Sequence, residues 1–189
     1  MKKQKRHSIT LSILLFIIAT SFTNDKGKYP PLSSFPQPEG IDNLLFYIQR
    51  AKDINTIVYQ LNTDKKGNLI EDHPINAYWI RYAENKQIVP LTIIQEKFAY
   101  GLKVKSIDER NKIYQFNFVS YKNRFFYLKQ SLADGKFHVY GRVNNQLAEI
   151  NKLFINIQGG SFWFPKIDYV AINGRSIKSN NPLVELVIP

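Results

Sequence analysis

Cysteine is absent from this chain of 189 residues, and its absence removes several classes of function. Thiol catalysis, cysteine-based zinc or iron–sulfur sites, lipoprotein acylation and disulfide bonds all require that residue. Histidine is scarce, since only His73 and His138 lie beyond the first 21 positions. The chain also lacks a G-x-S-x-G nucleophile elbow, and Glu71-Asp72-His73 offers no paired metal-ligand spacing. We therefore predict no catalytic triad, no metal site and no cofactor.

A long hydrophobic run is also missing. The main apolar segment, Ile9–Phe22, has 14 residues, whereas a transmembrane helix needs about 20. Four basic residues lie between Lys2 and Arg6, and the small residues Ala19 to Ser21 close the segment. A positive start, a short apolar centre and a small-residue exit are typical of a secretory signal peptide. We predict a signal peptide over residues 1–21, and its retention as a membrane anchor is the alternative.

Export without cysteine favours the periplasm or cell surface of a Gram-negative bacterium, because small secreted eukaryotic domains usually carry disulfides. We expect membrane contact only through the signal segment.

The chain has 26 basic and 15 acidic residues, but four basic residues precede position 22, and removal of that segment lowers the net charge from +11 to +7. The others are spread singly without a recognition helix, so we expect no nucleic-acid partner. An anionic small molecule, a glycan or an envelope protein remains open as the partner.

The predicted domain follows a linker. Residues 22–40 contain four of the nine prolines and show no apolar periodicity, which predicts a Pro-rich linker. Residues 41–189 contain no second linker and no internal repeat, so we predict a single β-rich domain.

Most of this domain has the pattern of short strands. Segments rich in β-branched and aromatic residues lie at 55–62, 75–83, 112–120, 124–130, 136–143, 153–157, 167–172 and 183–188. Their spacing, with 14% aromatic residues, favours a mainly β fold, either an antiparallel β-sandwich or a small barrel, with one or two short helices. Residues 43–51 fit a helix or a strand, and their spacing favours a helix.

One helix is predicted after position 91. Thr92 and Gln95 have the spacing of a capping box, and Ile94 and Phe98 share a face at helical spacing. Gly101 is placed to end this helix in a left-handed cap.

The segment Tyr78–Tyr82 is the first candidate site. In a strand, Trp79 and Arg81 share one face while Tyr78 and Tyr82 share the other, so both faces are substantially apolar. An arginine beside tryptophan keeps its charge and needs a partner. The functional interpretation is an aromatic-lined pocket in which Arg81 binds a carboxylate, phosphate or sulfate. An internal salt bridge, or a side chain that extends to solvent, is the alternative that the frequency of structural ion pairs favours.

A second aromatic group, Phe162–Phe164, follows two glycines. Three consecutive aromatic residues cannot all face one core from a strand, so Trp163 is a further candidate for ligand contact. The group suits the plug of a barrel end equally well. Paired carboxylates could support glycoside hydrolysis, but most acidic residues fall at turns or on the helix surface, where solvated side chains are usual.

The order of these blocks resembles a known family of exported bacterial proteins, the domain of unknown function 4833. The blocks are FPQPEG, NLLFYIQR, NTIVYQLN, a D…GN turn, PINAYWIRYAE and KFAYGLKVK. The resemblance covers Phe35 to the C-terminus and implies a bacterial origin and one exported domain, and it transfers no site residue. We expect a non-enzymatic β-domain of the cell envelope that binds a ligand or partner. The alternative is a small envelope-acting hydrolase that uses carboxylates.

Overall fold

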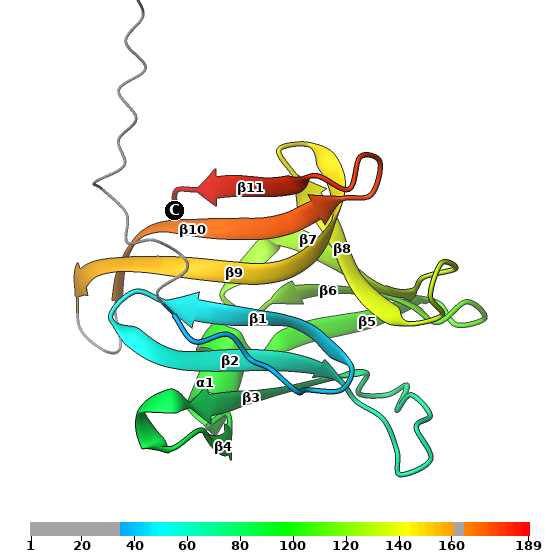
Figure 1. Cartoon of the computed structure of the whole chain (residues 1–189), viewed down its shortest axis with the longest axis horizontal. Coiled ribbons are helices and arrows are strands. Elements are labelled where there is room, and N and C mark those ends of the chain that lie inside the picture. Colours follow the sequence, from blue (N-terminus) through cyan, green and yellow to red (C-terminus); the bar gives the residue numbers. More distant parts are fainter. Residues whose placement is uncertain (1–34, 161–164) are drawn as a thin grey trace, which may run out of the picture. The chain divides into compact units, whose positions relative to one another are not determined.

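The computed structural model of the chain describes residues 35–160 and 165–189 (Figure 1). The predicted signal peptide over residues 1–21, most of the predicted linker and Trp163 lie outside these residues. Within the described part, no helix is long and apolar enough to span a bilayer.

The described residues form a mainly β structure, as the sequence predicts. The strands are β1 (Leu44–Arg50), β2 (Asp53–Leu61), β3 (Ile75–Arg81), β4 (Gln87–Pro90), β5 (Leu102–Asp108), β6 (Ile113–Phe118), β7 (Tyr121–Gln130), β8 (Phe137–Val143), β9 (Gln146–Gly160), β10 (Pro165–Ser176) and β11 (Pro182–Val187). All of them belong to one sheet of 11 strands.

The long strand β9 organises this sheet. β10 pairs along most of β9, while β8 and β1 pair with successive parts of it. Two arms therefore start from β9, one with the order β1-β2-β3-β4 and the other with the order β8-β7-β6-β5. The sheet curls so that the arms face each other as a half-barrel (Figure 1). Antiparallel pairing holds for every neighbouring pair except β1 and β9, which run parallel.

The hydrophobic core lies between the two arms, on what we call the inner face of the sheet. Phe46 of β1 stacks on Tyr59 of β2 with ring centroids 4.3 Å apart. From the other arm, Phe116 lies 6.1 Å from Phe46, and Phe118 meets Tyr59 edge-on at 5.7 Å. Such aromatic pairs contribute about 0.5–1.5 kcal/mol each beyond area burial, so they help to hold the arms together.

The opposite surface, which we call the outer face, is partly covered by residues 35–41. The Phe35 ring lies 5.3 Å from the Phe154 ring of β9. Gln49 of β1 donates from Nε2 to the main-chain oxygen of Pro36 at 2.6 Å. The composition assigned residues 35–40 to the linker, and in the structure these residues pack against the sheet.

Within residues 43–51 the chain forms the strand β1, Leu44–Arg50, so the helix that the spacing favoured there is wrong. The pairing of β1 with β2 shifts register between Leu44 and Phe46, which leaves both Leu45 and Phe46 buried. The interruption gives the apolar residues a helix-like spacing although the backbone is extended. Pairing with β2 and β9 decides the structure here, not the local pattern.

The predicted helix is α1 (Ile93–Gln95), and its capping box is confirmed. The Thr92 hydroxyl accepts from the main-chain N–H of Gln95 at 3.3 Å, and Gln95 Oε1 accepts from the Thr92 N–H at 3.0 Å. A π-helical turn, η3 (Glu96–Tyr100), follows. The left-handed cap predicted at Gly101 is wrong, because its φ of −64° and ψ of 156° are extended. Glycine is required there because a Cβ would lie 1.9 Å from the first carbonyl oxygen of η3.

Candidate functional site

Strand pairing places a row of side chains side by side on the outer face. Tyr47 of β1 pairs with Lys152 of β9, and Lys152 pairs with Asn173 of β10. Asn173 in turn pairs with Val184 of β11. Neighbouring strands lie about 4.8 Å apart, so side chains at paired positions are in reach of one another. The row therefore brings four strands that are distant in the sequence to one place.

A β-bulge at Asn151 sets the direction of Lys152. Ile150 and Leu153 both belong to the inner core, which period-two alternation allows only if one extra residue lies between them. The register against β10 shifts at this point, beside Gly174. A Cβ on Gly174 would lie 2.5 Å from a main-chain oxygen of β9, so only glycine fits against the bulge. The bulge thus directs Asn151 and Lys152 to the same side of the strand.

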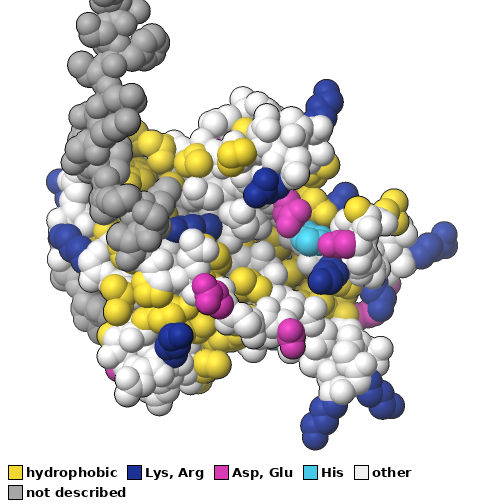
Figure 2. All heavy atoms as spheres, in the orientation of Figure 1, with side chains coloured by type: hydrophobic (Ala, Val, Ile, Leu, Met, Phe, Trp, Pro, Cys, Tyr) yellow, Lys and Arg dark blue, Asp and Glu magenta, His cyan; other side chains and the backbone are white. Residues whose placement is uncertain are grey.

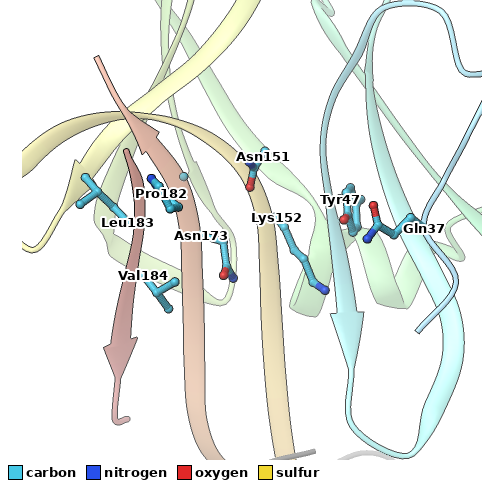
Figure 3. A pocket seen from close by; sticks show the side chains of 9 residues that line it. Gln37, Tyr47, Asn151, Lys152, Asn173, Pro182, Leu183 and Val184 are labelled. Atoms are coloured by element: carbon cyan, nitrogen blue, oxygen red, sulfur yellow. The ribbon is translucent and has the colours of Figure 1, made fainter. Parts of the chain in front are cut away.

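These residues line a hollow of about 420 Å³ on the outer face (Figure 3). Its lining is Gln37, Tyr47, Asn151, Lys152, Asn173, Gly174, Pro182, Leu183 and Val184. Figure 3 shows the Lys152 side chain extending between β9 and β1, with Tyr47 on the β1 side and Asn173 on β10. The volume falls within the range of roughly 300–1,000 Å³ that small-molecule sites occupy.

Lys152 is the electrostatic centre of the hollow. It is only 8% exposed, and its Nζ lies 5.8 Å from the Tyr47 ring centroid and 5.9 Å from that of Phe154. Burial lowers the pKa of Lys152 below 10.5, because desolvation disfavours the charged ammonium. Burial also raises the pKa of the Tyr47 hydroxyl, which keeps it neutral and able to donate a hydrogen bond.

Two predicted site residues lie near the hollow without lining it. The Tyr82 hydroxyl donates to the main-chain oxygen of Gln37 at 2.9 Å and so fixes one wall of the hollow. Tyr78 is 9% exposed, and its hydroxyl donates to Gln60 Oε1 at 3.1 Å. Both tyrosines therefore support the outer face, whereas Trp163 lies outside the described residues.

Trp79 and Arg81 do not form a pocket with each other. Trp79 is 5% exposed in the inner core and donates from Nε1 to Gln95 Oε1 at 3.2 Å. Arg81 pairs instead with Glu84 at 2.9 Å, and 38% of its side chain is exposed. The guanidinium over the Trp79 ring is that of Arg50, 4.8 Å from the ring centroid.

The Arg50 guanidinium lies over the rings of Trp79 and Tyr100. It pairs with Asp53 and donates to the Tyr100 hydroxyl at 2.9 Å. Its Nε is buried without a hydrogen-bond partner among the described residues. Because Asp53 balances the charge and two aromatic rings cover the guanidinium, this arrangement is suited to structure more than to ligand capture.

Two carboxylates converge on His138. Its Nδ1 lies 2.8 Å from Glu149 Oε1, and its Nε2 lies 2.8 Å from Asp134 Oδ2. Main-chain hydrogen bonding from Lys136, followed by the His138 contact, lowers the pKa of Asp134. The imidazole occupies the space between the two carboxylates. Within the described ranges, no group of three or more histidine or acidic side chains has an arrangement that could hold a metal ion.

Positive charge is distributed over the view in Figure 2. Lysine and arginine side chains occur there at several separate places, some of them next to one another. A buried lysine in a hollow is therefore a more specific feature than the overall charge.

The sequence analysis missed Lys152, although a signal was present. Asn151 and Lys152 are the only two consecutive polar residues in the segment from Ala148 to Ile157. Two consecutive polar residues break the alternation of a buried strand, and such a break is the sequence mark of a bulge.

Comparison with known proteins identifies the family. No curated protein and no solved structure matches the chain. The family profile described as Domain of unknown function (DUF4833) matches residues 46–186, which include both arms of the sheet and most of the hollow. The chain therefore belongs to the DUF4833 family.

Proposed function

We propose that this protein is a non-enzymatic ligand-binding domain that holds an anionic small molecule or the acidic part of a glycan in the Lys152 hollow. The observation that carries the proposal is a lysine only 8% exposed that lines a hollow of about 420 Å³. The positive charge of Lys152 would attract an anionic ligand, and the low exposure of the side chain strengthens that attraction. We further propose that the protein acts outside the cytoplasm of a Gram-negative bacterium, on the basis of the predicted signal peptide and the lack of cysteine.

The rest of the lining suits a ligand with both charge and hydroxyl groups. Asn151, Asn173 and Gln37 supply amides that can donate and accept hydrogen bonds. Tyr47 supplies an aromatic ring and a neutral hydroxyl beside the ammonium. A flat apolar ring next to amides is an arrangement that accommodates a sugar ring, while Lys152 would contact the carboxylate or phosphate.

Hydrolysis by carboxylates has less support. Neither the Lys152 hollow nor a second hollow of about 200 Å³ is lined by an aspartate or glutamate. The carboxylates of Asp134 and Glu149 are both hydrogen-bonded to His138, outside these hollows. A glycosidase needs its two carboxylates on either side of a substrate, not on either side of an imidazole.

The test is calorimetric titration of the protein with oligogalacturonate, with inorganic phosphate and with an uncharged galactose oligomer. We expect the two anionic probes to bind and the uncharged oligomer to bind at least about tenfold more weakly, since a charged hydrogen bond contributes about 1.5–3 kcal/mol. Lys152→Met should abolish that preference. The matched control is Lys129→Met, because Lys129 also lies over a tyrosine ring, at 4.8 Å from Tyr140, but does not line the hollow.

Three results would overturn the proposal. One is the absence of binding by both anionic probes, and another is unchanged binding by Lys152→Met. Cleavage of the oligogalacturonate during the titration would replace the binding function with the hydrolase alternative.

A further inference from the structure

The helical segment formed by α1 and η3, residues 93–100, turns its apolar side toward solvent. Ile93 is 70% exposed, Ile94 is 50% exposed and Phe98 is 73% exposed. A surface helix of a soluble domain normally directs such side chains to the core. The sequence placed Ile94 and Phe98 on one face, and the structure shows that this face points outward.

The side of the segment that faces the protein packs the Tyr100 ring edge-on against Trp79 at 5.7 Å and also makes polar contacts. Gln95 Oε1 accepts from Trp79 Nε1 at 3.2 Å, and the Tyr100 main-chain oxygen accepts from the Tyr59 hydroxyl at 2.7 Å. Rotating the apolar side inward would leave the buried donors of Trp79 and Tyr59 without partners, which is unfavourable. The outward orientation is therefore fixed by the fold.

Lysines adjoin the exposed apolar side chains in the sequence. Residues 93–105 contain Lys97, Lys103 and Lys105 against one acidic residue, Glu96, a net charge of +2. Lys97 lies within the helical segment, and Lys103 and Lys105 are exposed on β5 directly after it. Exposed isoleucine and phenylalanine with adjacent lysines are the composition of segments that lie in the headgroup region of anionic bilayers.

We propose that residues 93–98 dock on a membrane surface that contains anionic lipids. Ile93, Ile94 and Phe98 enter the headgroup region, and the neighbouring lysines contact the lipid phosphates. The proposal is independent of the Lys152 hollow and adds a membrane contact to the one expected through the signal segment. A second copy of the chain is the competing occupant of this surface, and the experiment separates the two.

The absence of cysteine allows a single fluorescent label to be placed on the surface in question. Ile93→Cys in the full chain is labelled with the polarity-sensitive dye NBD, and Leu132→Cys, at a residue 106% exposed between β7 and β8, is the matched control. Each protein is mixed with vesicles of phosphatidylcholine alone or of phosphatidylcholine with phosphatidylglycerol. We expect a blue shift only for the label at position 93 and only on the anionic vesicles, reduced by high salt because ions screen the attraction. The readout is local, so membrane binding by the amino-terminal segment does not produce it.

A second variant tests the apolar contribution. Phe98→Ser in the Ile93→Cys protein should require about tenfold more lipid for the same shift, since it removes one large buried side chain from the lipid interface. Leu132→Ser in the same background should change nothing, and circular dichroism verifies that both variants fold. Absence of the shift on anionic vesicles, or an equal shift on neutral vesicles, overturns the proposal. A shift without vesicles that grows with protein concentration also overturns it, in favour of self-association.

Discussion

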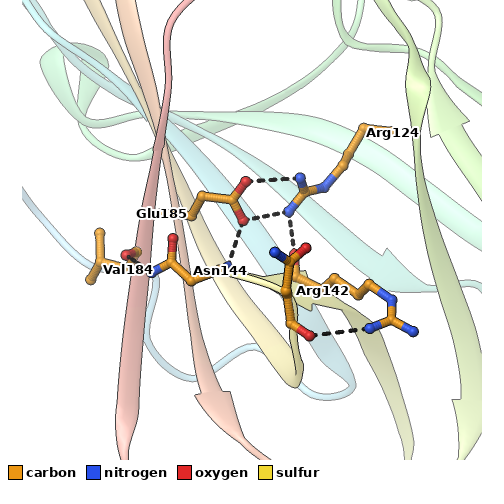
Figure 4. A network of polar contacts seen from close by, with 6 residues as sticks. Arg124, Arg142, Asn144, Val184 and Glu185 are labelled. Carbon is orange, nitrogen blue, oxygen red and sulfur yellow. Dashed lines mark hydrogen bonds and ion pairs between the residues drawn. The ribbon is translucent and has the colours of Figure 1, made fainter.

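The clasp between Arg124 of β7 and Glu185 of β11 permits a quantitative prediction about stability (Figure 4). Arg124 donates to Glu185 Oε1 at 3.0 Å and to Oε2 at 2.8 Å, so the pair is bidentate. Glu185 Oε2 also accepts from the main-chain N–H of Asn144 at 2.8 Å. The arginine and glutamate side chains are only 20% and 21% exposed. These contacts tie the terminal strand β11 to the β7–β8 arm.

We expect Glu185→Gln to lower the free energy of unfolding by about 2 kcal/mol. Exposed ion pairs contribute about 0.2–1 kcal/mol, whereas breaking a fully buried pair costs about 3–5 kcal/mol. This pair lies between those limits, and the glutamine oxygen can still accept from the Asn144 N–H. For a domain of this size the loss corresponds to a decrease in Tm of about 4–8 °C.

The effect should depend on pH in one direction. Hydrogen bonding from Arg124, with a smaller contribution from the Asn144 N–H, holds the pKa of Glu185 below its usual 4.5, although burial opposes this. Because the pKa of Glu185 is lower in the folded state, the ionised carboxylate contributes its full stabilisation of the fold above the unfolded-state pKa of 4.5. That stabilisation is lost as the pH falls through the folded-state pKa. The difference between wild type and Glu185→Gln should therefore shrink as the pH falls below 4.5.

The assay is urea unfolding followed by circular dichroism, at neutral pH and in steps toward acid. Glu84→Gln is the matched control, because Glu84 pairs with Arg81 while 51% and 38% of the two side chains are exposed. Glu84→Gln should lower the free energy of unfolding by less than about 0.5 kcal/mol. The reasoning is refuted if Glu185→Gln costs no more than Glu84→Gln. A difference that stays constant into the acid range would refute the assigned role of the carboxylate charge.

Three further predictions rest on single contacts. Gly174→Ala should lower the free energy of unfolding by about 1–3 kcal/mol, because the added Cβ would lie 2.5 Å from a main-chain oxygen. The control is Gly159→Ala, whose added Cβ would have nothing within 4 Å. In the same urea assay it should change the free energy of unfolding by no more than about 0.5 kcal/mol. Trp79→Phe should lower the free energy of unfolding by about 1–2 kcal/mol, because it removes the indole hydrogen bond and weakens the contact with the Arg50 guanidinium. A double-mutant cycle with Arg50→Met measures the energy of that contact. Binding of oligogalacturonate should weaken as the pH rises through the pKa of Lys152, because the ammonium then loses its charge. Burial depresses that pKa below 10.5. Calorimetry should therefore detect the loss of binding at a lower pH than the pKa of an exposed lysine would predict.

Interactions between near neighbours in the sequence were predictable. The capping box needs only Thr92 and Gln95, whose spacing is fixed by one turn of helix, and both of its hydrogen bonds are present. The strands β2 and β3 likewise correspond to two predicted segments, 55–62 and 75–83, each recognised from its own residues. Each depends on a few adjacent residues, so no knowledge of the rest of the chain was needed.

The partner of Trp79 was not predictable in this way. Along one strand, the next side chain on the same face is Arg81, about 6.6 Å away, whereas positions across a ladder are about 4.8 Å apart. Trp79 pairs with Ile57, and Ile57 pairs with Ile48, which places Arg50 diagonally within reach of the indole. The order β3-β2-β1 decides this contact, and no periodicity within one segment encodes it.

The candidate site was missed for a related reason. An interpretation based on alternating residues assumes that the strand has no bulge. The alternation holds on each side of the bulge, since Ala148 and Ile150 face the core before it and Leu153 faces the core after it. The bulge at Asn151 depends on Gly174, which a different strand supplies, so it is a property of the pairing and not of β9 alone. A bulge disrupts the ladder locally, and here it directs two consecutive side chains, Asn151 and Lys152, into the same hollow. The Lys152 hollow therefore lies where the alternation that builds the core is interrupted, and the aromatic residues of the individual strands do not indicate its position.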